Sequence, residues 1–384
     1  MTARLQPFRL ASGGTLIDRS RSLRFRFNGK DLAGHPGDTL ASALMANGVR
    51  LVGRSFKYHR PRGIVAAGAE EPNAVVQLDG DADEPNARAT TLELTEGLSA
   101  RSVNCWPGVG FDLGAIADRL SPLLPAGFYY KTFMGFPGGW NFYGPLVRRM
   151  AGLGTAPATA GRHAYEKRFH HCDVLVAGAG PAGLQAALAA ARGGARVMLA
   201  DEGLVPGGTL LDGAAEIGGR PATEWATGVV AELDSRPDVV RLARATVAGY
   251  YDHNFLTVVE LASPQSRIDE RLWKVRARRV VLATGATERP FVFADNDRPG
   301  VMLPSAALAF VRRYGVRPGD RAVAVTNNNS TYRIVAELVE AGVEVPVFAD
   351  IRTHPPEPLV AELAARGVLR LPRDPLGLDA FPHR

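Results

Sequence analysis

The stretch GAGPAG is the part of the chain whose residue types and spacing best suit chemistry. It contains Gly178, Gly180 and Gly183, and Asp201 ends the apolar run that follows the next helical stretch. Between a strand and a helix, the first glycine permits a tight turn, the second lets the backbone approach a pyrophosphate, and the third lets helix and strand pack closely. Free amides at the helix N-terminus then attract the phosphates. The sequence therefore predicts a dinucleotide-binding site.

Asp201 and Glu202 are placed to recognise the ribose of such a ligand. A carboxylate after the second strand of the unit accepts hydrogen bonds from the adenosine ribose and repels a 2′-phosphate. We therefore expect NAD or FAD rather than NADP. The sequence alone leaves the choice between NAD and FAD open.

Two further turns contain residues that suit a bound nucleotide. Gly208 lets its loop approach the ligand, and the hydroxyl of Thr209 can bond a phosphate or ribose oxygen, although a surface turn explains this composition nearly as well. Thr284 and Gly285 close the apolar stretch RRVVLATGA. In flavoproteins with two dinucleotide sites, such a turn lets the strand return beneath the nucleotide.

Alternating strands and helices must position these residues. Apolar runs at 172–178 and 195–201 flank a helix of small residues at 181–194, which predicts a βαβ unit with parallel strands. The same rhythm returns at 321–350, but its turn, TNNNSTYR, lacks the glycines. Asparagines can form the turn, yet their Cβ atoms obstruct a pyrophosphate. We therefore expect no second dinucleotide there.

The N-terminal part predicts a small α+β unit. LRFRFNG at 23–29 alternates apolar and polar residues and predicts a strand of a hairpin, while LASALMANG at 40–48 has helical spacing. AVVQL at 74–78 and ATTLEL at 89–94 alternate again and predict return strands.

An aromatic segment rich in Gly and Pro lies between residues 105 and 160. Such a segment has much apolar area to bury, either against its own chain or at a contact with another subunit. Its aromatic residues are Phe128, Tyr129, Tyr130, Phe133, Phe136, Trp140, Phe142 and Tyr143.

Composition excludes several classes of protein. The net charge is +6, but the arginines are scattered, so we do not expect nucleic-acid binding. Cys105 and Cys172 are the only cysteines, which excludes a disulfide scaffold, a cysteine-rich zinc site and an all-cysteine iron–sulfur cluster. The histidines form no metal-ligating or catalytic pattern. Because no apolar run is long enough to span a membrane, we expect a soluble, cytoplasmic protein without a membrane partner.

The order of several motifs resembles the N-terminal part of the alpha subunit of heterotetrameric sarcosine oxidase, from about residue 5 to about residue 368. Related chains include subunits of hydrogen cyanide synthase, opine oxidases and dye-linked proline dehydrogenases. The motifs are SFKYHRPRG (55–63), FYYKTFM (128–134), GAGPAG, LADE (199–202), ATGATERP (283–290), DRPGVML (297–303) and RYGVRPG (313–319).

The resemblance implies a fold class, α+β followed by α/β: a ferredoxin-like β-grasp domain and then a Rossmann-type two-dinucleotide-binding flavoprotein module. Some relatives hold a [2Fe–2S] cluster in the first domain, but this sequence has no cysteine between Met1 and Asn104, so we expect the fold without the cluster. The predicted parts are a cluster-free domain at 1–104, a connecting segment at 105–168, a dinucleotide-binding domain at 169–310 and a partial second nucleotide-binding half at 311–384.

The resemblance also implies an activity: oxidative demethylation of sarcosine to glycine, with transfer of the one-carbon unit to tetrahydrofolate and reduction of oxygen to hydrogen peroxide. In such enzymes the alpha subunit binds NAD, the beta subunit carries FAD, a covalent FMN lies between alpha and beta, and smaller gamma and delta subunits complete the heterotetramer. By position, the adenosine half of NAD would contact Ala182, Asp201, Glu202, Thr209 and Val247. No catalytic residue is expected in this chain.

The sequence departs from the family in its length, because a full alpha subunit is well over twice as long. After Arg366 the strand–helix pattern is lost, which predicts a truncation or a frameshift and an incomplete second half. The chain alone is then expected to be inactive. The alternatives are an alpha-type subunit of a related amine, opine or proline dehydrogenase or hydrogen cyanide synthase, and a non-catalytic nucleotide-binding assembly protein.

Overall fold

The computed structural model describes residues 6–79, 84–123, 127, 138–151, 154, 156, 163–213, 215–262 and 266–371. The chain divides into two compact units, one of Met1–Ala160 with Glu288–Arg384 and one of Gly161–Thr287. Residues 304–310, which the predicted limits assign to the dinucleotide-binding domain, lie in the unit that contains the N-terminal sheet. The predicted domain limits stay predictions.

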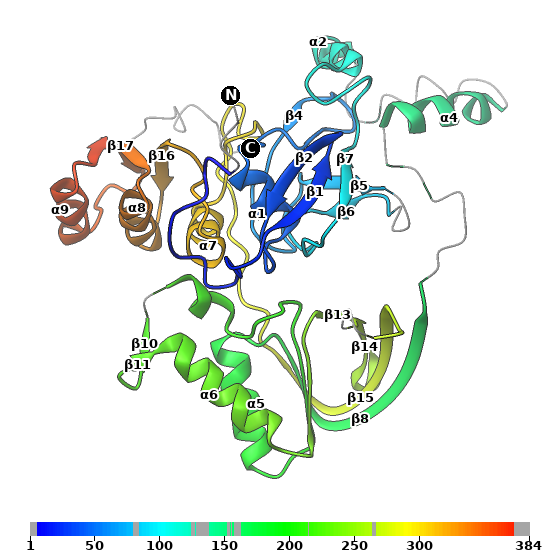
Figure 1. The fold of residues 1–384 in the computed structure, drawn as a ribbon, viewed down its shortest axis with the longest axis vertical. Coiled ribbons are helices and arrows are strands. Elements are labelled where there is room, and N and C mark those ends of the chain that lie inside the picture. The colour runs from blue at the N-terminus through cyan, green and yellow to red at the C-terminus, as the bar shows by residue number, and fades with distance from the viewer. Residues whose placement is uncertain are drawn as a thin grey trace. The chain divides into compact units, whose positions relative to one another are not determined.

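The first unit begins with a five-stranded mixed sheet in the order β2-β1-β7-β5-β6 (Figure 1). Its hairpin has the predicted alternation, because Leu23, Phe25 and Phe27 point into the core and the intervening arginines are exposed. Helix α1 is buried along its whole length, and its N-terminus is closed by a capping box between Thr39 and Ser42. The elements are β1 (Leu23–Phe27), β2 (Lys30–Gly34), α1 (Leu40–Ala46), β5 (Val75–Leu78), β6 (Ala87–Arg88) and β7 (Ser99–Ser102), with a separate pair β3 (Gly53–Arg54) and β4 (Pro61–Arg62). This arrangement is the small α+β unit that the sequence predicts.

The strand predicted at 89–94 is wrong. The segment turns on itself and keeps a single bridge, from Glu93 to Thr39. The carbonyl oxygens of Ala89 and Leu92 accept the amides of Ala41 and Leu40, at 2.9 and 2.8 Å. These helix amides have no acceptor within α1, so the segment satisfies them instead of pairing with the sheet.

The aromatic segment is described only in part. Phe128 to Phe136 lie outside the described residues, whereas Trp140 and Phe142 lie on α4 and are 42% and 72% exposed. Whether the segment contacts its own chain or another subunit stays a prediction. The elements here are η1 (Leu113–Ala115), α2 (Ile116–Arg119), η2 (Ser121–Leu123) and α4 (Gly139–Ala151).

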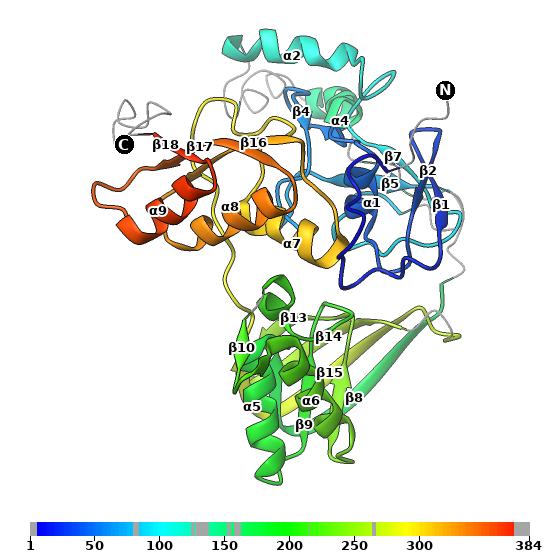
Figure 2. The ribbon, with the colours of Figure 1, turned by 60° about the vertical axis from the view of Figure 1, so that its left-hand side comes forward.

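The last part of the first unit is a parallel sheet in the order β16-β17-β18 with helices beside it (Figure 2). Helix α7 joins this part to the N-terminal sheet, because Phe310 packs in the same core as Phe25, while Val311 packs with Phe348 of the second sheet. The elements are α7 (Pro304–Tyr314), β16 (Arg321–Thr326), α8 (Ser330–Glu340), β17 (Glu344–Asp350), α9 (Glu357–Ala365) and β18 (Leu369–Leu371).

The second unit is a six-stranded sheet in the order β12-β9-β8-β15-β14-β13, in which β12, β9, β8 and β15 are parallel and β14 and β13 antiparallel. Helices α5 and α6 lie side by side against it, and Leu184 and Val229 of these helices pack on Val176 and Leu199 (Figure 1). The predicted βαβ unit is confirmed. The elements are β8 (Tyr165–Ala177), α5 (Pro181–Arg192), β9 (Val197–Ala200), η3 (Gly208–Asp212), β10 (Glu216–Ile217), β11 (Arg220–Pro221), α6 (Ala222–Asp234), β12 (Val239–Leu242), β13 (Ala245–Tyr251), η4 (Asp252–Asn254), β14 (Phe255–Leu261) and β15 (Glu270–Leu282).

Among the helices of the described residues, none has the length and apolar character that a membrane span requires.

Candidate dinucleotide site

Two of the three glycines of GAGPAG, at the junction of β8 and α5, are required by the packing of the chain itself. Gly178 has a φ of +100°, and a Cβ atom there would overlap the carbonyl oxygen of Ala283. A Cβ atom at Gly183 would overlap the carbonyl oxygen of Gly178. Strand, turn and helix therefore approach one another as the sequence predicts for these positions.

Gly180 is different, because nothing in the chain requires a glycine there. It is the N-cap of α5 with φ −71° and ψ −177°, an ordinary extended conformation, and no atom lies within 4 Å of a Cβ built on it. The space in front of it is open. Pro181 has no amide hydrogen, and the amides of Ala182 and Gly183, in the first turn, have no acceptor within the helix. This arrangement fits a phosphate that approaches the backbone at Gly180.

Asp201 follows β9 and binds the glycine-rich turn directly. Its carboxylate accepts the amides of Ala179 at 2.5 Å and Gly203 at 2.8 Å. A carboxylate offers about four lone-pair sites, so it can still accept a ribose hydroxyl. The sequence did not reveal that Asp201 also holds the turn in place. Its one indication was Ala179, the small residue between Gly178 and Gly180, whose amide Asp201 accepts. Glu202, beside it, is exposed.

The other residues predicted at the site lie at different distances from this turn. Gly208 has a φ of +55°, and a Cβ there would lie 3.0 Å from the Cα of Gly180. Its neighbour Gly207 donates its amide to the carbonyl of Ala179 at 2.8 Å. The loop 207–208 therefore lies against the glycine-rich turn. Thr209 is exposed in η3.

Val247 lies on β13, and Thr284 and Gly285 follow the end of β15. The amide of Ala245 donates to the carbonyl of Asp201 at 2.7 Å, which places Val247 two residues further along β13. Thr284 and Gly285 are exposed and follow Ala283, whose amide donates to the carbonyl of Ala177 at 2.8 Å. Ala283, the first residue of ATGATERP, lies against the turn, because its carbonyl oxygen would overlap a Cβ atom at Gly178.

The turn of the second half is closed by its own side chains. The hydroxyl of Thr326 accepts the amide of Asn328 at 3.1 Å and lies 2.8 Å from the hydroxyl of Thr331. The side-chain oxygen of Asn328 accepts the amide of Ser330 at 3.0 Å. That this turn binds no dinucleotide stays a prediction.

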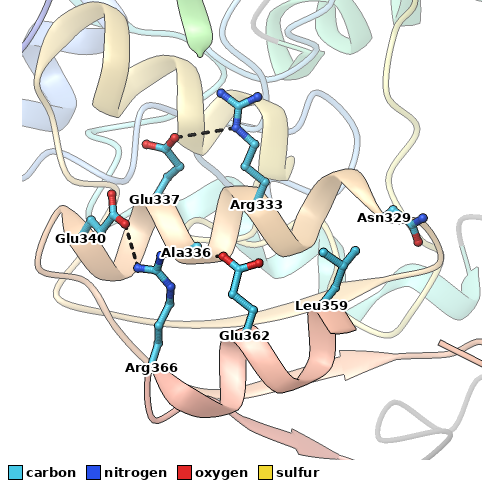
Figure 3. Close-up of a pocket in the computed structure, with 8 residues that line it drawn as sticks. All are labelled: Asn329, Arg333, Ala336, Glu337, Glu340, Leu359, Glu362 and Arg366. Atoms are coloured by element: carbon cyan, nitrogen blue, oxygen red, sulfur yellow. Dashed lines mark hydrogen bonds and ion pairs between the residues drawn. The ribbon is translucent and has the colours of Figure 1, made fainter. Parts of the chain in front are cut away.

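Three further features lie outside this turn: a buried thiol, the possible metal ligands and a cavity between two helices. Burial raises the pKa of Cys172 to about 11, so its thiol stays protonated. No group of three or more metal-ligating side chains occurs in the described part of the chain. A cavity of about 320 Å³ between α8 and α9 contains paired charges, Arg333 with Glu337 and Arg366 with Glu340 (Figure 3).

The fold and the turn define the class of protein. A family model described as pyridine nucleotide-disulphide oxidoreductase matches residues 172–315, and one described as 2Fe-2S iron-sulfur cluster binding domain matches residues 20–105. The chain is therefore a ferredoxin-like domain followed by a dinucleotide-binding module of the oxidoreductase type. L-proline dehydrogenase from P. horikoshii has the same fold, with a TM-score of 0.60 at 20% identity over 92% of this chain and 58% of that chain.

Sequence comparison gives the particular relatives. The sarcosine oxidase alpha subunit of Rhizobium meliloti (strain 1021) is 50% identical over 378 residues, which is 96% of this chain and 38% of the relative. The corresponding alpha subunit of Corynebacterium sp. (strain P-1) is 40% identical over 88% of this chain and 31% of the relative. An opine oxidase subunit of Agrobacterium tumefaciens (strain Ach5) is 30% identical over 51% of this chain and 42% of the relative. These matches confirm the resemblance to sarcosine oxidase alpha subunits, although the chain spans less than half of their length.

The residues present do not fit an iron–sulfur cluster in the first domain. Cys105 is the one cysteine in the matched range 20–105, at its last position. A cluster of this type takes four thiolates, or two when histidines replace the others. The ferredoxin-like fold is therefore confirmed. Its cysteines, however, are too few to hold the [2Fe–2S] cluster after which the family is described.

Proposed function

We propose that this chain is the NAD-binding part of a sarcosine oxidase alpha-type subunit. The main observation that supports an NAD site is the open space at Gly180, where the packing of the chain does not require a glycine. The resemblance to the alpha subunits supports the assignment to this enzyme.

The residues of the turn would bind and orient the ligand. The amides of Ala182 and Gly183 donate to the pyrophosphate, and the positive end of α5 lies behind them. Asp201 accepts a ribose hydroxyl while it holds the turn through Ala179. We assign Gly208, Thr209, Val247, Thr284 and Gly285 to the same site. Because a carboxylate repels a 2′-phosphate, NAD or FAD is favoured over NADP, and the resemblance favours NAD.

In the complete enzyme we place substrate oxidation on FAD of the beta subunit, with FMN between alpha and beta and tetrahydrofolate as acceptor of the one-carbon unit. Oxygen would be reduced to hydrogen peroxide. This chain contributes no catalytic residue, and alone it should not oxidise sarcosine. The matches to opine oxidase subunits support a second candidate, an alpha-type subunit of an amine or opine oxidoreductase on the same scaffold.

Mass spectrometry of the ligand released from the purified native complex tests the first assignment. NAD released in stoichiometric amount supports it, and a complex that releases FAD but no NAD contradicts it. Oxygen consumption by the complex with sarcosine and with opines as substrates then separates the two candidate enzymes. A chain that oxidised sarcosine without partner subunits would overturn the assignment of catalysis to those subunits.

A further inference from the structure

A buried carboxylate in the first domain is held entirely by backbone amides. Glu71 is 1% exposed. One of its oxygens accepts the amides of Val65 at 2.7 Å and Ala66 at 2.6 Å, and the other accepts those of Asn73 at 2.6 Å and Ala74 at 2.9 Å. Both oxygens therefore have two donors each, and the negative charge is stabilised by four amides.

Two other buried carboxylates of the described residues, Asp38 and Asp112, each have a side-chain partner. Asp38 pairs with Arg9, and Asp112 pairs with His59. Within the described residues, no cation forms an ion pair with the Glu71 carboxylate. The loop 65–74 is thus shaped as an anion-binding concavity, and the anion in it belongs to the chain.

Amide concavities of this kind are typical of phosphate and iron–sulfur sites. The domain matches a family described by its [2Fe–2S] cluster, yet it lacks the thiolates to hold one. We propose that Glu71 supplies internally the negative charge that orders the loop 65–74, and that this domain is a permanently redox-silent support without an iron–sulfur cluster.

The ordered loop has a definite structural use. The carbonyl of Val65, whose amide Glu71 binds, accepts the amide of Leu303 at 2.8 Å, at the start of α7. Val65 and Asn73 also line a cavity of about 820 Å³ together with residues of the segment 288–304. Glu71 therefore positions the surface of the ferredoxin-like domain against which α7 begins.

Amide hydrogen exchange of the whole chain, resolved by residue, tests the proposal with Glu71→Ala and Glu71→Gln. In Glu71→Ala, exchange at Val65, Ala66, Asn73 and Ala74 should be about tenfold to a hundredfold faster, because charge-assisted hydrogen bonds are lost. Exchange at the amide of Leu303, which donates to the carbonyl of Val65, should also become faster. Glu71→Gln has one carbonyl oxygen in place of two acceptors, so only one pair of amides should stay protected. The matched control is Glu70→Gln, since Glu70 is the exposed neighbour.

Sodium formate is the probe for the role of charge. Formate should restore slow exchange in Glu71→Ala, whereas sodium chloride at equal ionic strength should not. Unchanged exchange in both Glu71 variants would overturn the proposal. So would uptake of iron and sulfide by the wild-type chain during anaerobic reconstitution. If Glu71→Ala does not fold, the asymmetric loss of protection in Glu71→Gln decides the question.

Discussion

Replacing Gly180 by valine separates ligand binding from folding at the candidate site. No atom lies within 4 Å of a Cβ at this position, and φ is −71°, so the folded chain accepts a side chain there. Valine is a poor N-cap, but it also restricts the unfolded chain, and the two effects are each about 1 kcal/mol or less and opposite in sign. The free energy of unfolding should therefore change by no more than about 1 kcal/mol.

The effect of Gly180→Val on binding should be much larger. The valine side chain fills the space through which the pyrophosphate reaches the amides of Ala182 and Gly183. Hydrogen bonds to a charged group contribute about 1.5–3 kcal/mol each, so the loss of two is about 3–6 kcal/mol. The dissociation constant for NAD should rise by about two to four orders of magnitude.

Isothermal titration calorimetry with NAD and thermal unfolding followed by circular dichroism measure the two quantities on the same preparation. The matched control is Gly183→Ala, whose Cβ would overlap the carbonyl oxygen of Gly178. It should lower the stability by about 1–3 kcal/mol or more through overpacking. If Gly180→Val retained NAD with unchanged affinity, the pyrophosphate would not lie at this turn. If Gly180→Val unfolded the chain, the inference that the folded chain has room for a side chain at position 180 would be refuted.

Three further predictions address other groups. Asp201→Ala should weaken NAD binding by about tenfold to a hundredfold in the same titration, whereas Glu202→Gln should bind nearly as wild type; the reverse result would move the ribose contact to Glu202. Burial raises the pKa of Cys172 from 9.0 to about 11. The contribution of the protonated thiol to the free energy of unfolding is therefore complete below pH 9 and is lost as the pH rises to about 11. Urea unfolding should show this loss of about 2–3 kcal/mol, and Cys172→Ala should abolish it; an equal alkaline loss in the variant would refute burial as its cause. His59→Ala should cost about 3–5 kcal/mol in urea unfolding, because it leaves the buried carboxylate of Asp112 without its 2.7 Å partner; a loss below about 1 kcal/mol would mean that the amides of Trp106 and Gly114, which also donate to Asp112, suffice.

The local patterns of the sequence predicted most of the framework. The βαβ unit at 172–201 and the second strand–helix–strand unit at 321–350 both form, because periodicity of apolar residues fixes which face is buried. The alternation at 89–94 predicted a strand that does not form, because tertiary contacts decided the conformation of this segment. It reports a local preference, and the unsatisfied amides of α1 outweighed that preference in the folded chain.

The sequence by itself determined a small α+β unit, a βαβ unit, and the positions of the glycine-rich turn and its carboxylate, since these depend on residue types at short spacing, whereas the ferredoxin-like and flavoprotein domain types were implied by the family resemblance. The motif assigns each of the three glycines a role, but only the tertiary structure shows the atoms that require Gly178 and Gly183 and leave Gly180 open, because these atoms, such as the carbonyl oxygen of Ala283, can be distant in the chain. The same holds for Glu71. Its type and neighbours resemble those of a solvated glutamate, and its role follows from four amides that converge on it only when the loop 65–74 closes.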